Sequence, residues 1–243
     1  MKKHVGEGLY IKKGGWKFSG DVPLKFDNHI QRSVPLYFEG HNQICDLCDF
    51  FVKNESIIYD LGCSTGTLSL KLAEYNKEKN GVQVIGVDVE PEMIKMAQKK
   101  MKTYPYLNDS NMHFVVDDVT KIEIEAADLI VCYYTVQFIS PSVRQEFINK
   151  LYKNLNCGGA LLLFEKVRGA DARFQDVLTS LYTDFKIRQG YSAEDIIAKA
   201  KSLEGILKPF STQENIVMLK DAGFNEINTI QKYICFEGFM AIK

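Results

Sequence analysis

A glycine-containing turn is the part of this sequence best suited to bind a ligand. It follows a short apolar run that includes Asp60, and it contains Gly62, Cys63, Ser64 and Gly66. Glycine permits positive φ angles and leaves room for a ligand to approach the backbone. A carboxylate at Asp60 can accept hydrogen bonds from an ammonium group, and its negative charge is unsuited to a phosphate. The turn therefore predicts a ligand with a cationic amino group.

Two further acids stand at similar positions along the chain. Asp88 follows the apolar run 82–87, and Asp118 follows the run 112–116. An acid at the first position can accept both hydroxyls of a ribose, as in dinucleotide enzymes. At the second, a carboxylate can accept from an adenine amino group while the N–H of Val119 reaches a ring nitrogen. One acid at the end of a strand is commonly a solvated loop charge, but three in this order predict S-adenosylmethionine (SAM).

Other nucleotide loops fit the turn less well. A nicotinamide dinucleotide loop has the pattern G-x-G-x-x-G, and here Ser64 occupies the place of the middle glycine. The G-K-[ST] ending of a phosphate-binding loop is absent. We therefore expect SAM rather than NAD or a nucleoside triphosphate.

The elements that must position these residues alternate along the chain. Expected strands are 56–61, 82–87, 112–116, 127–133 and 160–165, and expected helices are 39–52, 68–79, 92–102 and 143–155. Near-continuous apolar strands that alternate with helices predict a parallel sheet covered on both faces. A helix at 213–222 and strands at 226–231 and 233–242 would close the chain with a hairpin. The expected fold is therefore α/β, a Rossmann-like class I SAM-methyltransferase fold with a seven-stranded, mostly parallel sheet.

Two regions depart from the alternation. Residues 1–35 contain Gly14-Gly15, Pro23 and Pro35, so we expect an irregular segment there. Residues 1–38 would form an N-terminal arm or lid, and residues 39–243 the SAM-binding domain. Between about 170 and 210, two helical patterns follow each other without a strand, which predicts a helical cap inserted after the fifth strand.

Composition restricts the class of partner. Thirty basic and 31 acidic residues give a formal charge of −1, which argues against a surface dedicated to nucleic acid. No apolar run is long enough for a membrane span, and residues 1–16 lack the apolar core of a signal peptide, so we expect a cytoplasmic protein. Cys45 and Cys48 form a C-x-x-C pair, but zinc needs two more ligands and no second pair is evident. We therefore expect no metal site.

Beyond these motifs, the sequence resembles the carboxy-S-adenosyl-L-methionine synthases, which prepare a cofactor for carboxymethylation of the tRNA wobble uridine. The resemblance runs from about Trp16 to the C-terminus. It is carried by the segments IQRSVPLY (30–37), YDLGCS (59–64), TVQF (135–138), LNCGGAL (155–161), EK (165–166), DFK (184–186), GYS (190–192) and LE (203–204). The first and the last three of these lie outside the general SAM-fold motifs.

The resemblance implies a homodimer and a set of cofactor residues. These are Tyr37, Gly62, Cys63, Ser64, Asp88, Val89, Asp118 and Val119. Two departures stand out, because Tyr133 replaces a family asparagine and Ala200 replaces an arginine that would hold the cofactor's extra carboxylate. Arginine binds a carboxylate through two hydrogen bonds, whereas alanine offers no donor.

These departures lead to three hypotheses. The first is a SAM-dependent methyltransferase that acts on a small molecule. Its candidate catalytic residues are Tyr37, Tyr133 and Tyr191. Further acceptor-side candidates are Tyr134, Gln137 and His29, although Tyr134 and His29 are more simply interpreted as a packed ring and a surface histidine.

The second hypothesis keeps the family reaction, in which SAM and prephenate give carboxy-SAM and phenylpyruvate. It requires a cation near the methyl carbon, such as Lys199, Lys201 or Arg32. The third hypothesis is a SAM-binding regulatory protein without catalysis, which the intact loop and its acids argue against.

Overall fold

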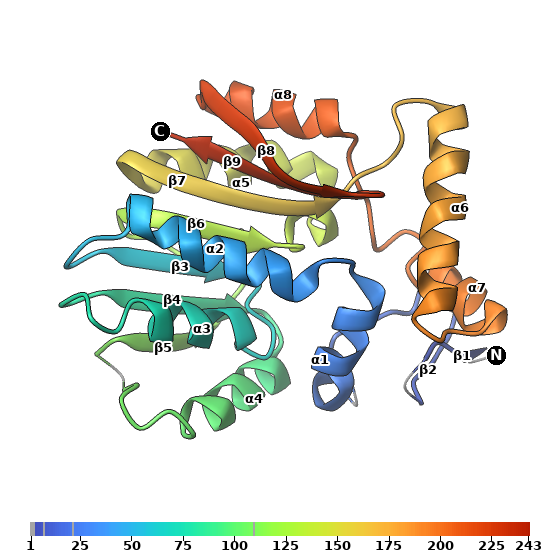
Figure 1. The fold of residues 1–243 in the computed structure, drawn as a ribbon, viewed down its shortest axis with the longest axis horizontal. Helices are drawn as coiled ribbons and strands as arrows, with labels where there is room; N and C mark the ends of the chain where they lie inside the picture. Colours follow the sequence, from blue (N-terminus) through green and yellow to red (C-terminus); the bar gives the residue numbers. More distant parts are fainter. Residues whose placement is uncertain (1–2, 7, 21, 109) are drawn as a thin grey trace.

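A seven-stranded sheet forms the centre of the protein (Figure 1), and the computed structural model describes residues 3–6, 8–20, 22–108 and 110–243. Its strands are β3 (Ile57–Leu61), β4 (Gln83–Asp88), β5 (Met112–Val116), β6 (Ala127–Tyr133), β7 (Leu155–Lys166), β8 (Glu226–Tyr233) and β9 (Phe236–Ile242). They lie in the order β5-β4-β3-β6-β7-β9-β8. The first five strands are parallel, while β9 is antiparallel to β7 and to β8. The predicted seven-stranded sheet with its terminal hairpin is confirmed.

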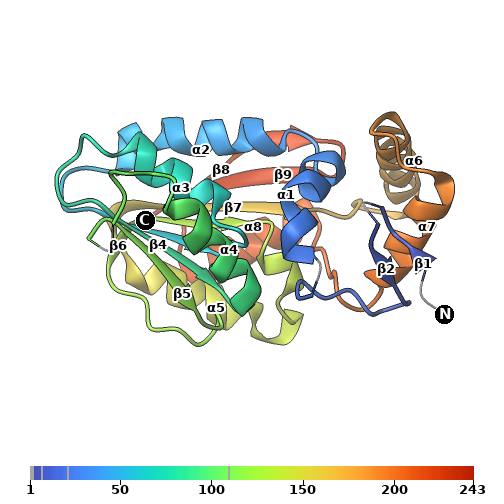
Figure 2. The same cartoon turned by 90° about the horizontal axis from the view of Figure 1, so that it is seen from below.

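The parallel strands are apolar on both faces because helices cover both. Leu129 and Val131 on β6 point into one core, and Ile130 and Cys132 point into the other. The helices are α2 (Tyr37–Phe51), α3 (Thr67–Tyr75), α4 (Pro91–Met101), α5 (Pro141–Asn154) and α8 (Thr212–Ala222). Side chains of α2 and α3 enter the first core, and those of α5 and α8 enter the second. Figure 2 shows α2 and α3 on one side of the sheet and α5 on the other. This layering places the carboxyl ends of β3, β4, β5 and β6 at one edge.

The prediction that residues 1–35 are irregular was wrong. They contain a small hairpin of β1 (Lys3–His4) and β2 (Tyr10–Ile11), and the helix α1 (Val22–Ser33). Pro23 does not prevent the helix because it lies in the first turn, where the missing N–H would have no intrahelical partner. Val22, Phe26 and Ile30 recur every four residues on its inner face. That spacing was the signal for the helix.

The two expected cap helices are present as α6 (Ala172–Arg188) and α7 (Ala193–Ser202), between β7 and α8. A third apolar cluster joins α7 to the N-terminal hairpin, α1 and α4, through Val5, Trp16, Phe26, Met93 and Ala198. Together, α6, α7 and the hairpin lie beyond one end of the sheet (Figures 1 and 2).

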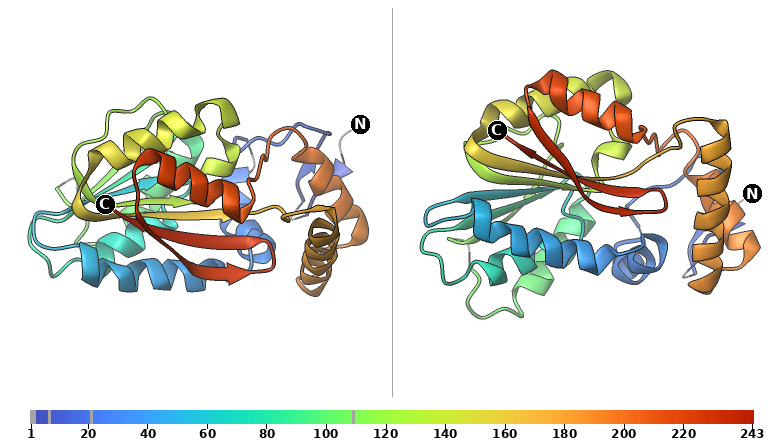
Figure 3. Two further views of the ribbon diagram at one scale, coloured as in Figure 1. Left: turned by 90° about the horizontal axis from the view of Figure 1, so that it is seen from above. Right: turned by 45° about the horizontal axis from the view of Figure 1, so that its top comes forward.

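The hairpin of β8 and β9 extends toward this cap (Figure 3), where Tyr182 of α6 packs on Phe236 with ring centres 5.2 Å apart.

Two further findings concern membrane-spanning helices and the C-x-x-C pair. None of the helices in the described part of the chain has the length and apolar character that crossing a bilayer requires. Cys45 and Cys48 are buried free thiols on α2.

Candidate cofactor site

The turn between β3 and α3 has the backbone shape that the glycines predict. Gly62, Ser64 and Gly66 have φ angles of 85°, 50° and 73°. The N–H groups of Gly62 and Cys63 both donate to Val87 O, at 2.8 and 3.0 Å, which ties the turn to the end of β4. A side chain at Gly62 would collide with Thr135 as well as strain the backbone. The turn is therefore held open toward the carboxyl edge of the sheet, at the point where strand order reverses between β3 and β6.

Asp60 lies beneath this turn and is almost completely buried. Its Oδ2 accepts a 2.6 Å hydrogen bond from Ser69 Oγ. Burial, with a smaller contribution from the nearby charge of Asp88, raises the pKa of Asp60 to about 7. A carboxyl group in this environment ionises most readily when a cation binds beside it.

Asp88 is fixed by backbone donors. Its Oδ2 accepts from Ser64 N at 2.8 Å and its Oδ1 from Glu90 N at 3.0 Å. Burial raises its pKa above the usual range, although these hydrogen bonds oppose the shift. A carboxylate oxygen can accept more than one hydrogen bond, so both oxygens keep capacity for ligand hydroxyls.

Asp118 has the opposite balance. Burial alone would raise its pKa, but hydrogen bonds from Thr120 and Lys121 outweigh it and hold the pKa below the usual range. Its Oδ1 accepts from Thr120 N at 3.0 Å and from Thr120 Oγ1 at 2.7 Å. Asp118 is therefore ionised near neutral pH.

These residues share one cavity of about 480 Å³, which we call the cofactor cavity. Its lining includes nearly all the residues that the sequence proposed for the cofactor: Tyr37, Asp60, Gly62, Cys63, Ser64, Asp88, Val89, Asp118, Val119 and Tyr133. Gly66 is not in the lining; it starts α3, where Phe114 and Ala97 leave no room for a side chain.

The acids that line the cofactor cavity are Asp60, Asp88, Glu90 and Asp118, and no lysine, arginine or histidine of the described residues lines it. This charge fits a ligand with cationic groups.

An aromatic wall closes the cofactor cavity at the end of β6. The ring of Tyr133 lies 5.2 Å from that of Tyr37 and 4.7 Å from that of Tyr134, between centres. The Tyr133 hydroxyl donates to Tyr37 O at 2.6 Å, and burial raises its pKa. Tyr133 therefore positions Tyr37 and keeps its proton.

Electron-rich ring faces such as these also attract cations.

The other acceptor-side candidates lie elsewhere or are occupied. Tyr191 and His29 are both buried and line a second cavity under the cap, with a 6.2 Å separation between ring centres. The interpretation of His29 as a surface histidine was therefore wrong. Gln137 lines both cavities, but its amide donates to Tyr134 O and accepts from Lys166 N. The structure thus separates Tyr191 from the two tyrosines with which the sequence grouped it.

The cations considered for the family reaction are also outside the cofactor cavity. Arg32 donates to Gln189 O at 2.6 and 3.0 Å and lies 4.7 Å from the centre of the Tyr191 ring. Lys199 lies over the Trp16 ring and lines the second cavity, as does the exposed Ala200. Lys201 is exposed and lines neither cavity.

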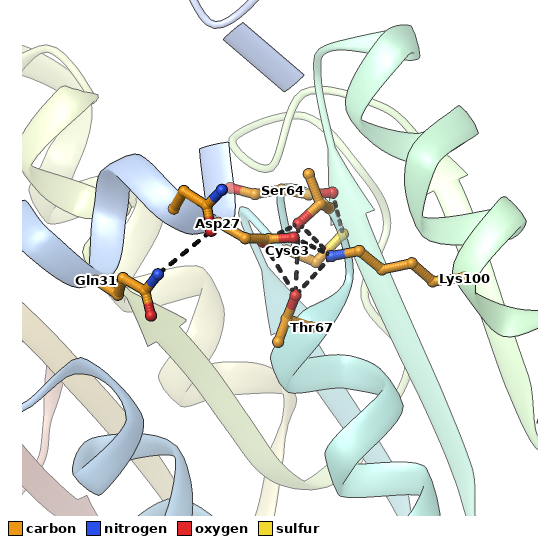
Figure 4. A network of polar contacts seen from close by, with 8 residues as sticks. Asp27, Gln31, Cys63, Ser64, Thr67 and Lys100 are labelled. Atoms are coloured by element: carbon orange, nitrogen blue, oxygen red, sulfur yellow. Dashed lines mark hydrogen bonds and ion pairs between the residues drawn. The ribbon is translucent and has the colours of Figure 1, made fainter. Parts of the chain in front are cut away.

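A polar network that sequence reasoning missed joins the N-terminal helix to the turn (Figure 4). Lys100 Nζ on α4 donates to Asp27 Oδ2 on α1 at 2.6 Å, and to the hydroxyls of Thr65 and Thr67 at 2.8 and 2.7 Å. Thr65 Oγ1 in turn donates to Asp27 Oδ1 at 2.6 Å. Because Phe26 and Ile30 of α1 line the cofactor cavity, the network holds one wall of that cavity against the turn.

Comparison with known proteins places the chain among enzymes of one family. A family model described as a methyltransferase domain matches residues 58–159. A carboxy-S-adenosyl-L-methionine synthase of Nautilia profundicola is 36% identical over 228 residues, covering 94% of each chain. One of Campylobacter jejuni is 36% identical over 231 residues, covering 95% of each.

Solved structures agree on the fold. Human N-acetylserotonin methyltransferase, determined in complex with SAM, superposes with a TM-score of 0.61 at 18% identity. The match covers 93% of this chain and 56% of that longer one. At this identity the likeness concerns the fold.

The network predicts that Lys100→Met weakens binding of S-adenosylhomocysteine. Loss of a partly exposed, charge-assisted contact should reduce the affinity roughly five- to tenfold, about 1–1.4 kcal/mol. The matched control is Lys99→Met, which removes an exposed charge from the same turn of α4. Isothermal titration calorimetry measures both variants, and equal affinities in the two would contradict the role of the network.

Proposed function

The chain belongs to the carboxy-S-adenosyl-L-methionine synthase family, and we propose that it is a divergent member that transfers the methyl group of SAM to a small-molecule acceptor. It is a SAM-dependent transferase with the class I methyltransferase fold. The observation that carries the proposal is the charge of the cofactor cavity, which has four acids and no base among its described lining residues. This lining supports a cationic sulfonium and offers no cationic side chain to a carboxylate attached to it.

Each group of residues has a task in such a transfer. Asp60 accepts from the ammonium group, Asp88 from the ribose and Asp118 from the adenine. When bound, SAM supplies a methyl group on a sulfonium, which is already activated for displacement. The chain therefore needs chiefly to orient the reactants and exclude water.

The wall of Tyr37 and Tyr133 serves that purpose. Its rings stabilise positive charge, and its hydroxyl groups stay protonated, so the wall contains no ionised base.

Carboxy-SAM synthesis is the alternative, and a specific observation favours it. The chain matches enzymes of that name over almost its entire length. Against it, the position of the family arginine is Ala200, on α7 in the wall of the second cavity. An arginine there could donate two hydrogen bonds to the extra carboxylate, and the alanine donates none. We therefore expect the family reaction to be lost unless another cation replaces the arginine.

Product mass distinguishes the two reactions. The purified chain is incubated with methyl-labelled SAM and either prephenate or the low-molecular-mass fraction of a cell extract. We expect S-adenosylhomocysteine, label in a small molecule of the extract, and no change of SAM with prephenate.

A cofactor product heavier than SAM by one CO₂ would overturn the proposal in favour of carboxy-SAM synthesis. Absence of any product would instead favour a SAM-binding protein without catalysis. Gly62→Ala is the matched control for background reactions, because the strained turn should not hold SAM.

We also propose that the protein is cytoplasmic, as the sequence predicts, and that it is a homodimer, as the family resemblance implies. The 17-residue helix α6 supports a second copy as partner, because Phe174, Val177 and Leu181 expose an apolar stripe along it. Light scattering of the purified chain should give the mass of two copies, and Leu181→Glu should give that of one. A monomeric wild-type chain would contradict this part of the proposal.

A further inference from the structure

The segment that follows β5 forms part of the cofactor cavity without regular secondary structure. Residues 117–126, all of which the structure describes, contain neither a helix nor a strand, and Asp118, Val119 and Thr120 line the cavity. Buried backbone N–H and C=O groups outside helices and strands still need hydrogen-bond partners. The shape of this segment, which we call the adenine loop, therefore depends on the groups that supply those partners.

Asp118 satisfies the N–H groups in the first part of the adenine loop. Its carboxylate accepts from the N–H and the hydroxyl of Thr120. Its backbone carbonyl accepts from the N–H groups of Lys121 and Ile122, at 2.8 and 2.9 Å. These hydrogen bonds form one tight turn around Asp118.

Lys150 on α5 satisfies the carbonyl groups of the same turn. Its Nζ lies 3.0 Å from each of three carbonyl oxygens, those of Val119, Thr120 and Ile122. An ammonium group has three N–H bonds, so these three carbonyl groups use all of them. Hydrogen bonds from a charged donor are stronger than those between neutral groups. One side chain of α5 thus holds the adenine loop at three points.

The packing of α5 fixes the position of Lys150. Phe147, one turn earlier on this helix, belongs to the same apolar cluster as Val119 and Ile124 of the adenine loop. Lys150 is half-buried, and burial lowers its pKa while the nearby charge of Asp118 opposes the shift. Movement of the loop away from α5 would expose apolar side chains and leave three carbonyl groups without the ammonium donor.

We propose that Lys150 is a positioning residue for the recognition of adenine, because it holds the adenine loop in the shape that presents Asp118 and the N–H of Val119 to the base. Lys150 acts through the loop, since it is not among the described residues that line the cofactor cavity. The proposal rests on one part of the proposed function, the assignment of adenine to Asp118. It holds for methyl transfer and for carboxy-SAM synthesis alike, because both use the same nucleoside.

The amino group is the feature of adenine that Asp118 can select. An amino N–H donates to a carboxylate, whereas the oxygen that replaces the amino group in hypoxanthine is itself an acceptor. A site built around such a hydrogen bond rejects an analogue that lacks the donor. The selectivity for adenine over hypoxanthine therefore depends on where the loop holds the carboxylate of Asp118.

The test compares S-adenosylhomocysteine with S-inosylhomocysteine, in which hypoxanthine replaces adenine. Isothermal titration calorimetry of the full chain gives both dissociation constants, and their ratio measures the selectivity for the amino group. We expect the wild type to favour S-adenosylhomocysteine by about tenfold or more. Lys150→Met should reduce this ratio by roughly threefold or more, whereas Lys150→Arg, which keeps a cationic donor, should retain most of it.

Controls separate positioning from a loss of stability and from an effect of charge alone. Lys153→Met removes an exposed charge from the last turn of α5 and should leave the ratio unchanged. Hydrogen exchange of the amides in residues 119–122 should be faster in Lys150→Met than in the wild type. An equal loss of affinity for both nucleosides in Lys150→Met, or a lower ratio without faster exchange, would overturn the inference.

The wild type distinguishes this inference from the proposed function. Equal binding of the two nucleosides by the wild type would overturn the assignment of adenine to Asp118, and the inference with it. Failure of S-adenosylhomocysteine to bind the wild type would instead overturn the proposed function.

Discussion

The molecule depends on the burial of two carboxylates, Asp60 and Asp88, at the carboxyl edge of a parallel sheet without basic side chains beside them. Asp60 lies in β3 and Asp88 ends the neighbouring strand β4, and the turn from Gly62 to Gly66 brings the backbone against them. An isolated charge is expensive to remove from water, so such groups either take up protons or await a cation. The raised pKa of Asp60 is the first of these responses, and a ligand with an ammonium and a sulfonium group would produce the second.

Two cavities of opposite charge extend this constraint to the whole active region. The cofactor cavity is lined by acids, and the second cavity under the cap is lined by lysines, with α1 forming part of the wall between them. Helix α1 lines both cavities, and the N-terminal hairpin, α6 and α7 line the second, so the sheet and its own helices do not form either cavity alone.

Much of the fold follows from local sequence, and the site follows in part. Strands β5 and β6 lie at the predicted residues because apolar runs between polar turns leave little choice of boundary. The cofactor turn was predictable because each of its glycines has a positive φ angle, which other residues rarely adopt. Helix α1 was missed because Pro23 was taken as a breaker, although a proline in the first turn removes no intrahelical hydrogen bond. Lys166 and Lys186 of the second cavity were missed because a lysine after a strand or in a helix is usually solvated. Only the packing of α6 over the end of β7 buries them.

The claim that Asp60 receives the cationic amino group of the ligand is tested most directly by proton linkage. Calorimetric titration with S-adenosylhomocysteine, from pH 6 to pH 8 and in buffers of different ionisation enthalpy, measures affinity and proton release together. A carboxyl group with a pKa of about 7 in the free protein must lose its proton to pair with an ammonium group. The account therefore predicts proton release on binding near pH 6, and an affinity that rises with pH and levels off above pH 7. Binding without proton release, or an affinity that falls over this range, would contradict it.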